Sequence, residues 1–363
     1  MSNDPSASAP VAPSDPSPNR EVRYEYSDAL GPLLAQLGVS LLISTYDAGK
    51  LVVIGSQQNK LNFSFHNFER AMGIAAGTGR IAVGGKDWVY FLNNAPDLAP
   101  QIAPAGTHDA CFLTRAAQHT CDISVHEMAW GKQELWVVNT LFNCLCHMSS
   151  SHNFIPRWRP PFIDALAAED RCHLNGLAMQ NGMPKYVTVL DQTNVKGGWR
   201  PNKAKNGCIL SVETGAVVVG GFAMPHSPRV YQNRLWVCDS GRGALMSIQP
   251  SQGEKEVVVQ LPGYPRGLAF MGQYAFVGLS KIRETAVFGE LPISESSEPL
   301  KCGVAVVDLV EKKMLGLIEF QGGISEIFDV QVLGGIRSPI LSGPYASLDG
   351  MGPIWLVPSP GAK

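Results

Sequence analysis

Three histidines occupy related positions in a short segment that the chain repeats, and together they could do metal chemistry. His126 and His226 each begin a copy of the segment, and His173 lies two residues before Asn175, where another copy begins. Neutral imidazoles that converge on one point are ligands that Zn²⁺ and similar metals prefer. A metal with one open position would activate water or polarise a substrate oxygen. The sequence therefore predicts a divalent transition metal (zinc, iron, copper or manganese) on His126, His173 and His226.

Charged and hydroxyl side chains fall at the matching positions of the other copies. We expect a small anionic substrate to be bound through its carboxylate or phosphate by Arg70, Arg266 and Asn175. Proton transfer is expected from Tyr264, Glu326 and Glu127. A water-filled channel would also be lined with polar residues, and a slip of one residue in the alignment would turn any of these side chains to the other face of its strand.

The repeated segment consists of a small or glycine-containing apolar strand, a polar gap and a second strand of the type Leu-Trp-Val. Six copies are present, the last degenerate: Met72–Val83, His126–Val137, Asn175–Val187, His226–Val237, Arg266–Val277 and Phe328–Leu341. Self-similarity at a period of roughly 40–60 residues is typical of β-propeller blades. Residues two apart on a strand point the same way, so aligned residues of the inner strands should meet near one axis.

The two ends of the chain leave the number of blades open between six and seven. The hairpin expected at Ser40–Gly55 has no inner strand of its own, whereas strands are expected at Pro339–Ser342 and Ile354–Val357. Either the ends share one closing blade or a seventh blade exists. We expect an all-β fold, a single β-propeller domain over residues 23–360 with six blades favoured.

The first residues of the chain differ in composition from the rest. The first 20 residues contain five Ser and five Pro and no apolar core. Such a composition cannot repay the entropy of ordering, and it lacks the apolar segment of a signal peptide. We therefore expect a disordered tail over residues 1–22.

Charge and cysteine content narrow the partners and the location. The net charge is −2, and positive side chains gather only at Lys196–Lys205, so nucleic acid is not an expected partner. The sequence contains no run of about 18 apolar residues, so we expect no transmembrane helix. The eight cysteines include no CxxC pair and no secretion signal is present, so we expect reduced thiols in a cytoplasmic protein.

Two stretches resemble known propeller families. The phrase LWVCDSGRG at Leu235–Gly243 resembles the strand-turn-strand of NHL-type, gluconolactonase-like and strictosidine-synthase-like propellers. The region from Leu37 to Ser347, with STYDAGKL at Ser44–Leu51 and RCHLNGLA at Arg171–Ala178, resembles an uncharacterised bacterial domain-of-unknown-function family. The resemblance implies a propeller fold and carries no activity.

Two functions fit these features, and a purely structural scaffold in a larger assembly is a third possibility. The first is a metal-dependent enzyme that acts on a small anionic substrate at the propeller axis, by hydrolysis, lyase chemistry or oxidation. The alternative is a non-catalytic propeller that binds a peptide or saccharide on its loop face. An enzyme should gather unusual polar residues at the axis, whereas a binding module should carry exposed aromatic residues on one rim.

Overall fold

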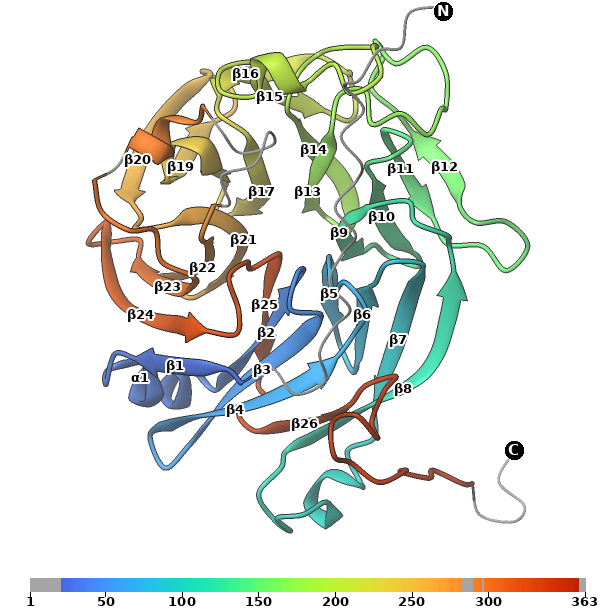
Figure 1. Ribbon diagram of the computed structural model, residues 1–363, viewed down its shortest axis with the longest axis vertical. Helices are drawn as coiled ribbons and strands as arrows, with labels where there is room; N and C mark the ends of the chain where they lie inside the picture. The colour runs from blue at the N-terminus through green and yellow to red at the C-terminus, as the bar shows by residue number, and fades with distance from the viewer. Residues whose placement is uncertain (1–20, 283–289, 296, 359–363) are drawn as a thin grey trace, which may run out of the picture.

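Six sheets surround a common axis in the computed structural model of the chain, which describes residues 21–282, 290–295 and 297–358 (Figure 1). The inner strands contact one another in a closed ring, in the order β5, β9, β13, β17, β21, β25 and back to β5. The fold is therefore a six-bladed β-propeller, as the repeat predicts. Residues 1–20 of the expected tail and residues 359–360 of the expected domain lie outside the described residues.

Each of the first five blades is a continuous run of four antiparallel strands, from the axis outward. Blade 1 contains β5 (Ile74–Gly77), β6 (Arg80–Gly84), β7 (Trp88–Asn94) and β8 (Ala110–His119). Blade 2 contains β9 (Val125–Trp130), β10 (Leu135–Asn139), β11 (Cys144–His147) and β12 (Ile155–Trp158). Blade 3 contains β13 (Leu174–Gln180), β14 (Met183–Val189), β15 (Gly207–Ser211) and β16 (Val217–Phe222). Blade 4 contains β17 (Pro225–Tyr231), β18 (Arg234–Asp239), β19 (Ala244–Gln249) and β20 (Glu254–Gln260). Blade 5 contains β21 (Tyr264–Met271), β22 (Tyr274–Ser280), β23 (Gly303–Asp308) and β24 (Lys313–Gly322).

The sixth blade combines the two ends of the chain. Its inner strand is β25 (Asp329–Gly334), which pairs antiparallel with β2 (Val39–Thr45) from Ser44↔Asp329 to Val39↔Gly334. The blade continues through β3 (Lys50–Gln57) to β4 (Lys60–Asn67). The shared closing blade explains why the hairpin near the start of the sequence has no inner strand of its own.

Two terminal strands extend the outer edges of other blades. β1 (Arg23–Tyr26) pairs with β24 in blade 5, and β26 (Pro339–Ser342) lies parallel to β8 in blade 1. The strand expected at Ile354–Val357 is wrong, because this segment has no regular secondary structure and pairs with no strand among the described residues. These additions cover outer edges that would otherwise expose unpaired backbone groups.

The core lies between the blades. Middle strands such as β2 and β23 are buried along their whole length, because each faces a neighbouring blade on both sides. One cluster joins Leu42 and Val53 of blade 6 to Ile74 and Val83 of blade 1. Each interface of this kind removes apolar surface from water on two blades at once, so the ring holds together as one body.

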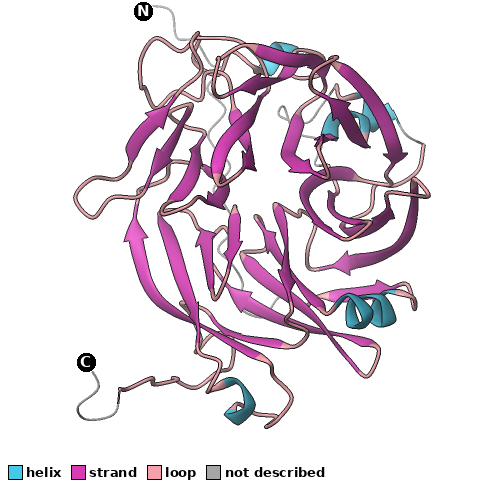
Figure 2. Cartoon of the chain, turned by 180° about the vertical axis from the view of Figure 1, so that it is seen from behind, coloured by secondary structure: helices cyan, strands magenta, loops and turns pink. Residues whose placement is uncertain are grey.

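The few helices lie outside the blades or in their connecting loops (Figure 2). α1 (Leu30–Leu37) ends at Gly38, whose φ of +66° is the left-handed conformation that glycine adopts at helix ends. The 3-10 helices of the described residues are η1 (Ala99–Gln101), η2 (Arg200–Asn202), η3 (Ser240–Arg242) and η4 (Pro292–Glu295). None of the helices among these residues has the length and apolar character needed to cross a membrane.

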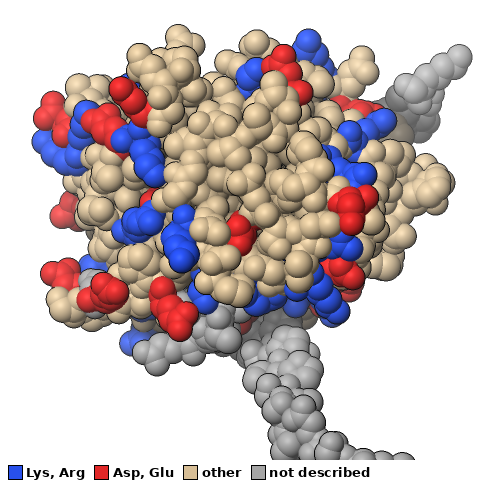
Figure 3. Space-filling view, turned by 90° about the horizontal axis from the view of Figure 1, so that it is seen from above, with Lys and Arg blue, Asp and Glu red and all other residues tan. Residues whose placement is uncertain are grey.

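Charged side chains are interspersed on the surface. On the side shown in Figure 3, basic and acidic residues are interspersed around a largely uncharged area. This mixture agrees with the net charge of −2, and this face offers no broad positive patch of the kind that attracts nucleic acid.

Candidate functional site

A cavity of about 320 Å³ lies at the axis, where the inner strands begin. Seven of the nine residues that the sequence predicts for the site line it: Arg70, His126, His173, His226, Tyr264, Arg266 and Glu326. Its apolar wall is formed by Tyr46, Met72, Trp199, Met224 and Phe328. The alignment of the repeat therefore brings residues from six blades to one place.

A repeated backbone turn aims the side chains of four blades into this cavity. Arg70, Ser124, His173 and Met224 precede the inner strands of blades 1 to 4, and their φ angles are +51°, +54°, +51° and +49°. Residues other than glycine seldom adopt this left-handed conformation, and each instance costs of order 1 kcal/mol or more. All four residues line the cavity, so the strain is concentrated where the side chains converge.

His126 and His226 are held by the same hydrogen bond in two blades. The Nδ1 of His126 lies 3.1 Å from the carbonyl oxygen of Ser124, and that of His226 lies 2.9 Å from the carbonyl oxygen of Met224. A carbonyl only accepts, so Nδ1 carries the proton and Nε2 presents a lone pair. Nε2 has no hydrogen-bond partner among the described residues in either case.

Both of these imidazoles are neutral at pH 7. Burial lowers the pKa of His126 well below 6.5, and the charges of His173 and Arg266 lower it further. Burial and the charge of Arg266 lower the pKa of His226 in the same way. Their environment therefore removes protons from the two rings and preserves the lone pairs on Nε2.

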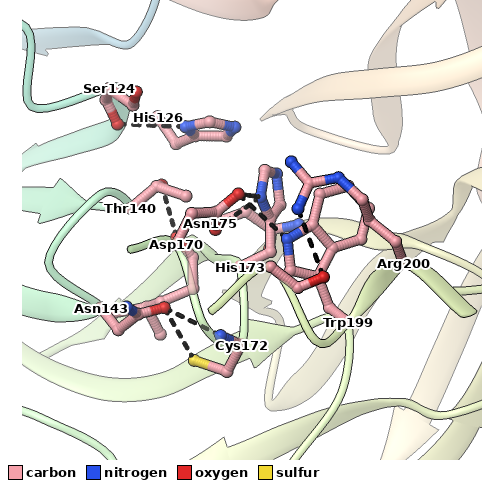
Figure 4. Close-up of polar contacts among 12 residues, drawn as sticks. Ser124, His126, Thr140, Asn143, Asp170, Cys172, His173, Asn175, Trp199 and Arg200 are labelled. Atoms are coloured by element: carbon pink, nitrogen blue, oxygen red, sulfur yellow. Dashed lines mark hydrogen bonds and ion pairs between the residues drawn. The ribbon is translucent and has the colours of Figure 1, made fainter. Parts of the chain in front are cut away.

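His173 is fixed by a carboxylate instead of a carbonyl. Its Nδ1 lies 3.0 Å from both oxygens of Asp170, whose Oδ2 also accepts the indole N–H of Trp199 at 3.0 Å (Figure 4). The His173 ring lies 4.8 Å from that of His126 and 4.5 Å from that of Trp199. Asp170 and Trp199 come from long irregular loops, so the repeat gave no signal for their part in the site.

Arg266 is the cation of this cavity that forms no ion pair with another described residue. Its Cζ atom lies 3.4 Å from the centre of the Phe328 ring, and the guanidinium makes no hydrogen bond or ion pair with a described residue. Burial lowers the pKa of Arg266, although nearby Tyr264 and Glu326 oppose this effect. Arg70, in contrast, forms an ion pair of 2.6 Å with Asp122.

Tyr264 is a protonated phenol on the same wall. Its hydroxyl lies 3.5 Å from the Nδ1 of His226, and burial raises the pKa of Tyr264 above its usual value. A phenol with a raised pKa stays neutral at pH 7. It can donate a hydrogen bond to a ligand, but it is a poor base.

The structure places the other two predicted residues, Asn175 and Glu127, outside the cavity. The amide of Asn175 donates to the carbonyl of Pro225 at 3.1 Å and accepts from the hydroxyl of Thr188 at 2.6 Å. It therefore ties blade 3 to blade 4, and no part of this arrangement supports its predicted role in substrate binding.

Glu127 belongs to a separate buried ion cluster. It pairs with Arg229, which also lies 3.7 Å from Asp329, and it accepts the backbone N–H of Leu177 at 2.6 Å. Burial raises the pKa of Glu127 to about 7, although the charge of Arg229 opposes this effect. At the equivalent position in blade 1, a Cβ on Gly73 would lie 2.9 Å from the carbonyl of His126. This row of residues therefore faces the seams between blades, which is why Glu127 does not reach the cavity.

The three histidines as placed do not form a metal site. Among the described residues, no three His, Cys, Asp or Glu side chains form a group that could hold a metal ion. The imidazoles share one cavity, but their donor atoms do not converge on one point. The predicted metal on His126, His173 and His226 thus remains a prediction.

The fold and the axial cavity define the protein as a six-bladed propeller with a polar site at its axis. A family model described as a domain of unknown function, DUF4915, matches residues 28–341, and the chain belongs to this family. The resemblance to a domain-of-unknown-function family is thus confirmed, and its bacterial origin stays a prediction.

Comparison with other proteins supports the fold alone. No curated protein matches the chain. Among solved structures, the crystal structure of a nidogen/laminin complex contains a similar chain, with a TM-score of 0.51 and 10% identity, covering 82% of this chain and 99% of that one. At this identity the likeness shows a shared architecture.

Proposed function

We propose that the protein binds a small organic anion in the axial cavity, with Arg266 as the residue that pairs with its charge. The observation that carries this proposal is the guanidinium of Arg266, which lies on the cavity wall without an ion pair or hydrogen bond to a described residue. A cation partly withdrawn from water without a carboxylate in direct contact is costly. A ligand carboxylate or phosphate would supply that counter-charge and accept the guanidinium N–H groups.

Calorimetric titration of Arg266→Met against the wild-type protein tests the proposal. The probes are acetate, phosphate, citrate and 3-phenylpropionate at pH 7.5 and low salt. We expect at least one to bind the wild-type protein and to lose about 30-fold or more in affinity in the variant, as for the loss of one partner of a buried charge pair. Arg115→Met, at an exposed position, should bind like the wild type. Equal binding by Arg266→Met and the wild type would contradict the proposal.

A second candidate is the metal-dependent enzyme acting on a small anionic substrate. One observation favours it: the Nδ1 atoms of the three histidines all hydrogen-bond to a carbonyl or carboxylate, an arrangement that is usual for histidines that bind metals. Plasma mass spectrometry of purified protein, with and without chelator, tests it. About one equivalent of metal in the wild type, lost in His226→Ala, would support it. The alternative peptide or saccharide site on the loop face stays a prediction.

A further inference from the structure

The hydrogen bonds of the three histidines restrict which ligand atoms the cavity can accept. Each Nδ1–H is already used, by the carbonyls of Ser124 and Met224 and by the carboxylate of Asp170. The rings of His126 and His226, whose Nδ1–H groups point to carbonyls, therefore present hydrogen-bond acceptors to the cavity and no donors. A bound anion cannot satisfy them, because an anionic oxygen is itself an acceptor.

A ligand that complements the cavity therefore needs two kinds of polar atom. Arg266 requires an anionic acceptor, and the imidazoles require N–H or O–H donors. Both requirements are met close together, since the ring of Phe328 packs against both groups. Its centre lies 3.4 Å from Cζ of Arg266 and 5.3 Å from the centre of the His126 ring. A donor on a carbon next to the anionic group can therefore reach His126 while the anion pairs with Arg266.

The apolar part of the cavity wall favours a ligand with an apolar side chain. Tyr46, Met72, Met224 and Phe328 present rings and thioethers to the cavity. Surfaces of this kind gain free energy by covering an apolar group. The volume of about 320 Å³ leaves room for a side chain of the size of a phenyl ring.

We propose, building on the anion site above, that the ligand is a small α-hydroxy or α-amino acid with an apolar side chain. Its carboxylate pairs with Arg266, its hydroxyl or ammonium group donates to Nε2 of His126, and its side chain covers the apolar wall. The two acid classes share this donor-and-carboxylate chemistry. They differ toward Glu326, which also lines the cavity and attracts an ammonium group more than a hydroxyl.

Three matched acids test the inference: 3-phenylpropionate, 3-phenyllactate and phenylalanine, which differ only in the α-substituent. In the wild-type protein we expect phenyllactate or phenylalanine to bind about 10-fold more tightly than phenylpropionate, as for one added hydrogen bond to a buried acceptor. Loss of phenylalanine binding in Glu326→Gln, with phenyllactate unchanged, would assign the amino acid. The reverse preference, insensitive to Glu326→Gln, would assign the hydroxy acid.

His126→Phe removes the acceptor while keeping a ring in its place. The preference for the α-substituted acid should disappear, and His126→Gln, whose amide oxygen accepts, should restore part of it. The Ser124 carbonyl keeps the N–H of Thr140 at 3.4 Å, so it retains a partner in the Phe variant. His152→Phe, at an exposed histidine, is the matched control and should bind like the wild type.

The outcomes separate this inference from the anion site. If the three acids bind equally and all depend on Arg266, the inference is overturned and the anion site stands. The same holds if none of the three binds while another acid or phosphate does. If no anion binds, both proposals fail.

Discussion

Arg229 and Arg266 come from the inner strands of neighbouring blades, β17 and β21, but their surroundings are opposite. Arg229 pairs with Glu127 and lies near Asp329, so two carboxylates from two other blades balance its charge. Arg266 rests on the ring of Phe328 without such a partner among the described residues. A half-buried arginine near the axis is therefore common to both positions. What distinguishes the structural arginine from the candidate binding residue is whether the fold supplies the counter-charge.

The largest expected effect comes from removing each arginine in turn. Arg229→Met would leave Glu127 and Asp329 buried without their counter-charge, and we expect the free energy of unfolding to fall by about 3–5 kcal/mol. Arg266→Met removes a charge that the fold does not pair, so stability should change by less than about 1 kcal/mol or rise. Urea denaturation of both variants measures the difference. Similar decreases in the free energy of unfolding of the two variants would contradict the proposed difference between Arg229 and Arg266.

The pH dependence of stability sharpens the comparison at the cavity. The folded-state pKa values of His126 and His226 lie well below the ordinary 6.5, so between those values the unfolded chain binds more protons than the folded one. Their contribution to stability is complete above pH 6.5 and is lost as the pH falls, by up to about 1.4 kcal/mol per pH unit for each ring.

The ion cluster acts in the opposite direction. The raised pKa of Glu127, about 7 against an ordinary 4.5, means that the folded protein holds this proton where the unfolded chain has released it. Its contribution is lost as the pH rises toward 7.

The effect of the two histidines is measured by urea denaturation from pH 5 to pH 8, compared between the wild type and the double variant His126→Phe/His226→Phe. A smaller acid-induced loss in the double variant is expected; identical profiles would contradict the assignment of two neutral histidines.

The smallest expected effect concerns the strained turn at the cavity. Glycine at position 124 would adopt the left-handed φ of +54° without strain, which should stabilise the folded state by about 1–2 kcal/mol. The greater conformational entropy of glycine in the unfolded chain should cost about 0.5–1 kcal/mol of this gain. Ser124→Gly should thus raise the free energy of unfolding by about 0.5–1 kcal/mol in a denaturation experiment. Ser251→Gly, at an exposed serine without a positive φ, should give no gain. A loss in Ser124→Gly would show that the turn carries no strain.

The repeat made the fold and most of the cavity lining predictable. Equivalent positions in successive blades are related by the symmetry of a propeller, so aligning the copies placed His126, His226 and Arg266 correctly at the axis. The same alignment placed Glu127 in the row between the cavity-facing residues. Its partner, Arg229, lies two blades away, and no local pattern indicates such a pair, so the ion cluster was not predictable and the proton-transfer role stays a prediction.

The loop residues could not be predicted for a different reason. Asp170 and Trp199 lie in insertions that break the period, so no copy elsewhere in the chain indicates their position. Asp170 lies only three residues before His173, whereas Trp199 reaches this pair from a separate loop, by tertiary folding. The left-handed conformation of Asp170, with φ of +46°, could not be predicted either, because no glycine at this position indicates a positive φ.

The shared closing blade has a consequence for synthesis of the protein. β2 is made within the first 45 residues, but its inner partner β25 is made only after residue 328. During translation, blades 1 to 5 can form in order as they leave the ribosome. Throughout this time, the backbone groups on the inner edge of β2 stay unpaired. The ring can close only when nearly the whole chain has emerged. We therefore expect chains truncated before Asp329 to aggregate through that open edge, even though five complete blades have already been made.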